Sequence, residues 1–445
     1  MKILSLDRRS LLRGAGLGLG LLLLGPRRGR DAAAAVDDMP HRFVSVYFAG
    51  AWDVLLGADT RDPGRTYGAI NLGTTRLAPE FRDPIPVQLR GRETLYGAAM
   101  APVVRHADVT TLFRGINMNT VAHPTGRSYV NSFLSPRGST VRGDSIGTTV
   151  AAISPSDDLV LPNVSIGLSS SNVSHGSEVN ALTLRRATEI TSVLRAERPI
   201  QDPQLAAALA AAQDASASCI SDRYPAPRPN DQLAASRQQM RRLLADDTSA
   251  AFDFRRADMA ALRERFGITQ AGLANPNDVG VSAAVASQLL RAGLSRTVTV
   301  MLDTRLDTHG AEWADQQPLR QRRGWEVLAA LLDELREDDP SMSHTTVMAH
   351  SEFARTPGIN GRGGRDHWFA NSMVVFGKAL AGGVFGATTV DNLGLAAVDL
   401  ETGRPAAGGT VLLPEHVGAT VVAALGGDAS PFRVQPIHSL ITGSP

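Results

Sequence analysis

Strand-like and helix-like segments alternate along most of this 445-residue chain. Six short stretches are apolar and rich in β-branched residues, as buried strands are, and they cover residues 41–50, 108–115, 162–168, 296–303, 345–350 and 371–377. Helical patterns are found at 231–245, 251–266, 282–292, 317–337 and 416–425. This alternation is typical of an α/β protein, and we predict a mostly parallel sheet sandwiched by helices.

The chain is long enough for one large α/β domain, which we expect to span residues 36–440. Residues 170–280 are rich in Ala and Arg and mostly helical in pattern, so we interpret them as a helical insertion within that domain. Hydrophobic residues make up 43% and charged residues 20% of the chain, a composition that excludes a disordered chain and a multi-span membrane protein.

The N-terminus has the pattern of an export signal. Adjacent arginines at positions 8 and 9 precede a short apolar stretch at 14–25 and four alanines at 32–35. A basic N-terminal region, an apolar central region and small residues at the cleavage site are typical of a cleavable signal peptide. The paired arginines resemble a twin-arginine signal. We predict that residues 1–35 are a twin-arginine signal peptide, and that the folded protein is exported to the periplasm or secreted with no stable membrane span after cleavage. An uncleaved N-terminal anchor is the alternative, although a membrane span needs about 20 apolar residues.

Charge and cysteine content exclude several classes of site. Outside the basic leader the chain is mildly acidic, so its charge does not indicate nucleic-acid binding. Cys219 is the only cysteine, so the chain has no internal disulfide, haem attachment, iron–sulfur cluster or thiolate zinc site. Any bound metal must therefore be held by oxygen and imidazole ligands.

Acids and histidines follow the predicted strands, at the edge where α/β sheets bind ligands. Asp53 follows the first strand, residues 117–123 follow the second, 303–310 the fourth and 350–357 the fifth, whereas 364–368 precede the sixth. Carboxylates gathered at one edge would repel each other, and a bound divalent cation is the simplest compensation. Each pair taken alone has a structural alternative, such as a loop cap or an ordinary ion pair.

The spacing of these residues is compatible with metal binding. Asp307 and His309 are two residues apart, so in an extended segment both side chains point to the same side. Asp366 and His367 are adjacent, and the glycines just before them permit a turn that lets both side chains converge. Carboxylate and imidazole without thiolate suit zinc, manganese or similar ions, and two ions about 4 Å apart would clamp a phosphoryl or sulfuryl group.

As an ordered set, these motifs resemble the domain-of-unknown-function 1501 family of exported bacterial proteins, within the alkaline phosphatase and sulfatase superfamily. The resemblance rests on the segments 50–53 (GAWD), 307–310 (DTHG), 351–357 (SEFARTP), 364–368 (GRDHW) and 418–428. It implies an alkaline-phosphatase-like sheet with a two-metal site. By motif position, one metal set would be Asp53, Asp366 and His367, and the other Asp307 and His309 with His416, while Glu352 and Arg355 would lie close to the metals.

The resemblance also bears on the nucleophile. In the superfamily a Ser or Thr after the second strand attacks phosphorus or sulfur, but here Pro124 stands in that place. The neighbouring Thr125 and Ser128 are then the candidate nucleophiles, and Arg355 or Arg127 would add positive charge that stabilises the transition state. Direct attack by a metal-activated water would need neither hydroxyl.

We therefore expect an exported hydrolase that uses divalent zinc, manganese or calcium ions to cleave a phosphate or sulfate ester, in a small molecule or a polymer. The main alternative is a non-catalytic periplasmic binding or scaffold protein with a degenerate superfamily site, which would bind a ligand, a polymer or a protein partner. A redox enzyme is a third hypothesis, for which the sequence holds no cofactor motif.

Overall fold

The computed structural model describes residues 40–61, 74–138, 140–154, 159, 161–195 and 248–442, together with a few positions between 202 and 215. The expected signal peptide at 1–35 and the expected helix at 231–245 lie outside the described residues. Within the described part, no helix is both long enough and apolar enough to cross a membrane.

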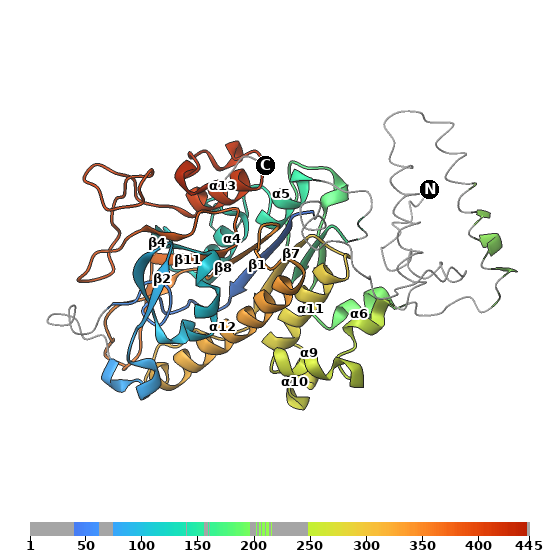
Figure 1. The fold of residues 1–445 in the computed structure, drawn as a ribbon, viewed down its shortest axis with the longest axis horizontal. Helices are drawn as coiled ribbons and strands as arrows, with labels where there is room; N and C mark the ends of the chain where they lie inside the picture. The colour runs from blue at the N-terminus through green and yellow to red at the C-terminus, as the bar shows by residue number, and fades with distance from the viewer. Residues whose placement is uncertain are drawn as a thin grey trace.

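An eight-stranded sheet forms the centre of the molecule, in the order β12-β4-β11-β8-β1-β7-β5-β6 (Figure 1). The strands are β1 (Arg42–Phe48), β4 (Thr110–Asn117), β5 (Asn163–Ile166), β6 (Leu182–Leu184), β7 (Thr297–Leu302), β8 (Thr345–His350), β11 (Ala370–Phe376) and β12 (Gly383–Gly386). All six strands predicted from the sequence lie in this sheet. The two edge strands, β6 and β12, were not predicted, because segments of three and four residues are too short to show a periodic pattern.

Seven of these eight strands run in one direction. β1 pairs in parallel with β7 and β8, and Tyr47 lies opposite both Met301 and His350. β5 is parallel to β6 and β7, and β12 is parallel to β4. β11 is antiparallel to both of its neighbours, β4 and β8. The start of β11 therefore lies at the same edge of the sheet as the ends of the other strands, and this edge carries the candidate site.

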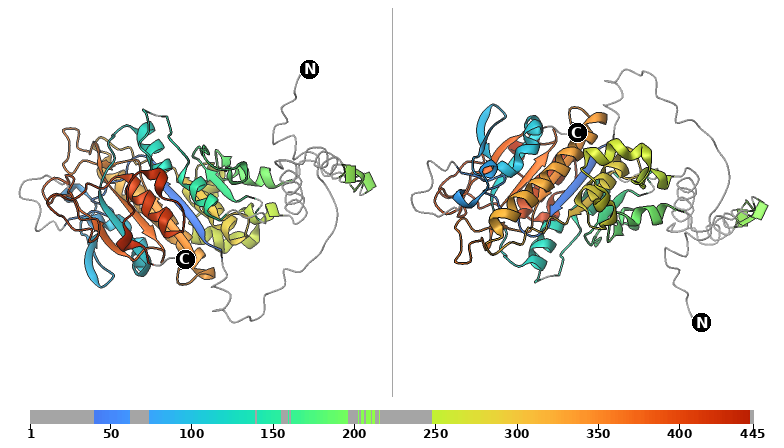
Figure 2. Two further views of the ribbon diagram at one scale, coloured as in Figure 1. Left: turned by 90° about the horizontal axis from the view of Figure 1, so that it is seen from above. Right: turned by 90° about the horizontal axis from the view of Figure 1, so that it is seen from below.

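Helices cover both faces of the sheet (Figure 2). One face packs against α11 (Val279–Arg291) and α12 (Trp313–Asp338), and the other packs against α4 (His123–Ser132), α5 (Ile146–Ile153) and α13 (Pro414–Ala424). Side chains alternate along β1, so that Val46 and Phe48 join the core beneath α12, whereas Tyr47 joins the core beneath α4 and α13. The predicted α/β fold with helices on both faces of a mostly parallel sheet is thus confirmed.

Three of the predicted helices, at 282–292, 317–337 and 416–425, correspond to α11, α12 and α13. The single helix predicted at 251–266 is wrong, because the segment is divided into η5 (Thr248–Phe252), η6 (Ala257–Met259) and α9 (Ala260–Arg265). The Asp253 carboxylate accepts a hydrogen bond from the backbone N–H of Arg255, a local bond that competes with helix formation.

The remaining elements are short. They are η1 (Thr74–Arg76), η2 (Pro79–Phe81), the hairpin β2 (Ile85–Leu89) and β3 (Arg92–Tyr96), η3 (Ala98–Val109), η4 (Ser177–Val179), α6 (Glu189–Leu194), α10 (Gln270–Ala274), the hairpin β9 (Ala354–Arg355) and β10 (His367–Trp368), η7 (Ser430–Phe432) and η8 (His438–Leu440). The described part of the expected insertion at 170–280 thus includes α6, α9 and α10, and also the sheet strand β6.

Candidate metal centre

Three histidines and one aspartate meet at the carboxyl edge of the sheet. The loop after β7 carries Asp307 and His309, α4 begins at His123 after β4, and His367 lies in β10, just before β11. We call these four side chains the donor cluster. Oδ1 of Asp307 lies 2.9 Å from Nε2 of His309, and 3.3 Å from Nε2 of both His123 and His367. The donor cluster thus brings together three ring nitrogens and a carboxylate oxygen from three separate parts of the chain.

The opposite ring nitrogen of each histidine already has a hydrogen-bond acceptor. The acceptors are Glu352 Oε1 for His123 (2.7 Å), Asp366 Oδ1 for His309 (3.0 Å) and the carbonyl oxygen of Val121 for His367 (2.7 Å). An acceptor at Nδ1 assigns the proton to that nitrogen, so that Nε2 of each neutral ring carries a lone pair. These three lone pairs face into the donor cluster.

Three members of the donor cluster, His123, Asp307 and His367, could hold one metal ion, because their ligand atoms all lie within 4.8 Å of one another. Nε2 of His309 and Nε2 of His367 are 2.9 Å apart, and Nη1 of Arg355 lies 3.3 Å from Nε2 of His309. Two lone pairs at 2.9 Å repel each other, and a proton or a metal ion between them removes this repulsion. Nε2 of His123 is buried and has no hydrogen-bond partner among the described residues. Ligand atoms bound to one zinc ion at about 2.0–2.1 Å lie about 3.3 Å from each other, close to the observed separations of 2.9 to 3.3 Å.

Nearby charges set the protonation of the donor cluster. Burial raises the pKa of Asp307, but the hydrogen bond and the positive charge of Arg355 outweigh it and hold that pKa well below its usual range. Burial lowers the pKa of His367 below its ordinary value. Burial also lowers the pKa of His123, but Glu352 and Asp307 together raise it overall, so a proton and a cation compete for Nε2 of this ring.

Arg355 fixes the position of Asp307. Its side chain is 0% exposed, and Nη2 donates to Oδ1 of Asp307 at 2.8 Å. The same guanidinium donates to the carbonyl oxygens of Gly50 (2.6 Å), Ala51 (3.1 Å) and Leu306 (2.9 Å). These bonds tie the loop after β1 to the loop after β7, so Arg355, a predicted catalytic residue, lies where it holds the donor cluster in place.

Two glycines permit the close approach of these loops. Gly50 has a φ of +105°, and a Cβ there would lie 2.5 Å from the backbone nitrogen of Leu306. A Cβ at Gly364 would lie 2.3 Å from the carbonyl oxygen of Gly310, directly after His309. Any larger residue at either position would push the loop that carries Asp307 and His309 away from its neighbours.

Asp53, the ligand implied after the first strand, is fully buried and makes its contacts elsewhere. Its Oδ2 accepts a hydrogen bond from Nε1 of Trp313 at 3.0 Å and lies 3.4 Å from Nε of Arg365. The Arg365 guanidinium lies over the Trp313 ring, with Cζ 4.6 Å from the ring centre. Asp53 therefore connects the loop after β1 with α12 and with the loop that leads to His367.

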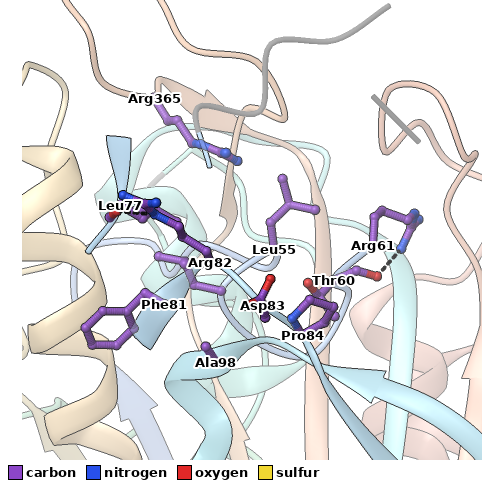
Figure 3. A pocket seen from close by; sticks show the side chains of 11 residues that line it. Leu55, Thr60, Arg61, Leu77, Phe81, Arg82, Asp83, Pro84, Ala98 and Arg365 are labelled. Atoms are coloured by element: carbon purple, nitrogen blue, oxygen red, sulfur yellow. Dashed lines mark hydrogen bonds between the residues drawn. The ribbon is translucent and has the colours of Figure 1, made fainter. Parts of the chain in front are cut away.

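Arg365 also borders a small pocket, together with Leu55, Thr60, Phe81 and other residues (Figure 3). No member of the donor cluster lines this pocket. The hollow shown in Figure 3 is thus separate from the candidate metal centre.

The other predicted site residues lie at different distances from the donor cluster. Asp366 contacts Nδ1 of His309, and Glu352 contacts Nδ1 of His123, so both carboxylates orient a histidine from outside. His416 lies at the start of α13, where its Nδ1 accepts a hydrogen bond from the backbone N–H of Leu413 at 3.1 Å. The structure therefore brings together Asp307, His309, Glu352, Arg355, Asp366 and His367, but not Asp53 or His416.

Both candidate nucleophiles lie on α4 and are half-buried. Thr125 and Ser128 are two and five residues after His123, spacings that place them on other faces of the helix than His123. Sequence reasoning did not propose His123 itself as a ligand, although it ends the 117–123 segment that follows the second strand. The available signal was its position, because His123 follows a predicted strand as Asp307 and His309 do.

Comparisons with known proteins identify a family. The model of the family described as "Protein of unknown function (DUF1501)" matches residues 59–419. No curated protein matches the chain. Among solved structures, the alkaline phosphatase from the Antarctic bacterium TAB5 aligns with a TM-score of 0.30 and 10% identity, over 76% of this chain and 91% of that chain. The α/β assignment rests on the sheet topology described above.

Proposed function

Because the chain belongs to the DUF1501 family, a family of unknown function, we propose its function from the donor cluster itself: a metal-dependent hydrolase of phosphate or sulfate esters. The observation that carries this proposal is the gathering of Nε2 of His123, Nε2 of His367 and the Asp307 carboxylate within 4.8 Å of one another. Nε2 of His309 lies 2.9 Å from both His367 and Asp307. Nδ1 of each histidine already faces an acceptor, so each neutral ring has its Nε2 available to bind an ion.

Members of the donor cluster would hold one divalent ion. Three imidazoles and one carboxylate favour zinc or manganese over calcium, which takes oxygen ligands. Glu352 and Asp366, each bonded to Nδ1 of a ligand histidine, would fix the ring orientations and raise ligand basicity. A bound ion would supply Lewis-acid stabilisation of negative charge on the ester oxygens.

The start of α4 would add to the binding of an anionic ester beside the donor cluster. α4 begins at His123, and its N-cap residue, Ala122, makes no side-chain cap hydrogen bond. The first N–H groups of the helix and its dipole therefore favour a negatively charged group at this end. Because Thr125 and Ser128 lie on other faces of α4 than His123, we propose that water, and not a side chain, attacks the ester.

The proposed function includes export of the protein from the cytoplasm. The twin-arginine-like leader favours export of the protein in the folded state, to the periplasm or outside the cell. Residues 36–440 would then form the mature domain, with residues 170–280 as its insertion. Its substrate would be an ester, in a small molecule or a polymer.

The purified protein, loaded with zinc, is expected to release nitrophenol from nitrophenyl phosphate or nitrophenyl sulfate well above the rate in buffer that contains the same zinc. Treatment with a chelator is expected to abolish this activity, and added zinc is expected to restore it, because the ion completes the site. Product release that is identical with and without the chelator would show that the reaction does not depend on the proposed site.

A second candidate function is a non-catalytic binding protein on the same scaffold. The observation that favours it is Pro124, which stands where the superfamily places its nucleophile. Stoichiometric metal without hydrolysis of either ester would favour this second function.

A further inference from the structure

Arg127 lies on the same face of α4 as His123. The two residues are four positions apart in the helix His123–Ser132, a spacing that places their side chains one above the other. Arg127 is exposed, whereas His123 is half-buried in the donor cluster. The helix therefore holds a positive charge about one turn from a proposed metal ligand.

The guanidinium of Arg127 lies over the ends of the central strands. Its Cζ is 5.9 Å from the centre of the Tyr47 ring, near the end of β1. The charges of Glu352, after β8, and Asp303, after β7, both act on it. Tyr47 is fully buried, and its ring packs beneath the guanidinium. Arg127 therefore lies near the carboxyl ends of β1, β7 and β8.

Other arginines near the donor cluster are already engaged. Arg355 is buried against Asp307, Arg362 lies 3.3 Å from Oδ1 of Asp366, and Arg365 lies beside Asp53. Arg127 forms no ion pair with a carboxylate within the described part of the chain. The side chain of Tyr47 interacts with Arg127, and the charge-assisted donors that do not face Tyr47 are available to a bound anion.

We propose that Arg127 binds the anionic oxygens of the substrate and makes the site selective for charged phosphate or sulfate esters over neutral esters. This inference rests on the proposed hydrolase function and names the charge of the substrate. The carboxylates of Asp307, Glu352 and Asp366 would otherwise repel an anionic ester, and the planar guanidinium fork matches two oxygens of a phosphate or sulfate group.

Calorimetric titration of the zinc-loaded protein with inorganic phosphate tests the inference without catalysis. Arg127→Met is expected to weaken phosphate binding about tenfold or more, the usual range for hydrogen bonds to a charged group. Arg127→Lys keeps the positive charge but loses the planar guanidinium group. Its affinity for phosphate is expected to lie between those of the wild type and Arg127→Met. Arg90→Met, at an exposed arginine outside the site, is the matched control and is expected to bind as the wild type does. Zinc content is expected to be unchanged in all variants.

A kinetic comparison separates this inference from the proposed function. Arg127→Met is expected to lower kcat/KM for nitrophenyl phosphate about tenfold or more, and to leave kcat/KM for the neutral nitrophenyl acetate within about twofold. If Arg127→Met binds phosphate as tightly as the wild type, the inference is wrong while the hydrolase proposal stands. If the wild type hydrolyses no ester but binds phosphate through Arg127, the hydrolase proposal fails and the anion site stands.

Discussion

Replacement of His367 by alanine is expected to remove the bound metal and, with it, ester hydrolysis. The ring supplies one of the proposed donor atoms, 3.3 Å from Asp307 and 2.9 Å from His309. Losing an outer partner of a metal ligand costs about 10–100-fold in metal affinity, so losing a ligand is expected to cost at least about 100-fold. Zinc content after equilibrium dialysis and the rate of nitrophenol release both report the change.

The control for this prediction is His438→Ala, which removes an exposed imidazole that lies outside the donor cluster. It is expected to keep wild-type zinc content and activity. His367 is half-buried, so the alanine variant is expected to fold, and its circular dichroism spectrum checks this. A folded His367→Ala protein that keeps full zinc content would exclude this residue as a ligand.

Of the substitutions proposed for this protein, Asp53→Ala is expected to lower the free energy of unfolding the most. Asp53 is fully buried beside Arg365, which is 2% exposed, and it also accepts the hydrogen bond of Trp313. Removing one partner of a buried ion pair typically costs about 3–5 kcal/mol, because the remaining charge loses its compensation. Guanidinium unfolding, followed by circular dichroism, measures this loss as a lower transition midpoint.

Asp53→Asn is the matched variant for this prediction. Trp313 donates to Oδ2 and the backbone N–H of Leu55 donates to Oδ1, so the single amide oxygen of asparagine keeps one of these two hydrogen bonds. Asp53→Asn is therefore expected to lose less stability than the alanine variant. If Asp53→Ala instead strips the metal without lowering the unfolding midpoint, Asp53 acts as a metal ligand, as the family resemblance implies, and not as the partner of Arg365.

The sheet could be predicted from the sequence because its central strands are buried on both faces. β1 and β8 are buried at every position, so they appear as continuous apolar, β-branched segments. The direction of β11 could not be predicted, because a strand pattern is the same in both directions. That direction is what places His367 at the same edge as Asp307.

The candidate site was predictable only in part. The rule that ligands bind at strand ends selected Asp307 and His309, whereas His367, which precedes its strand, was selected through the motif at 364–368. The rule also selected Asp53, although this residue turns into the core towards Trp313. Which strand-end acids face the site depends on the path of each loop, and that path depends on close contacts such as that of Gly50 with Leu306. No spacing along the sequence encodes such a contact.

X-ray absorption at the zinc edge, measured on the zinc-loaded wild-type protein, tests the central claim most directly. The account predicts about one zinc ion per chain, with about four nitrogen or oxygen neighbours at 2.0–2.1 Å and the outer-shell scattering of imidazole rings. A protein that retains no zinc, or whose zinc has a shell without imidazole, would contradict the claim that histidines of the donor cluster bind one ion together with Asp307.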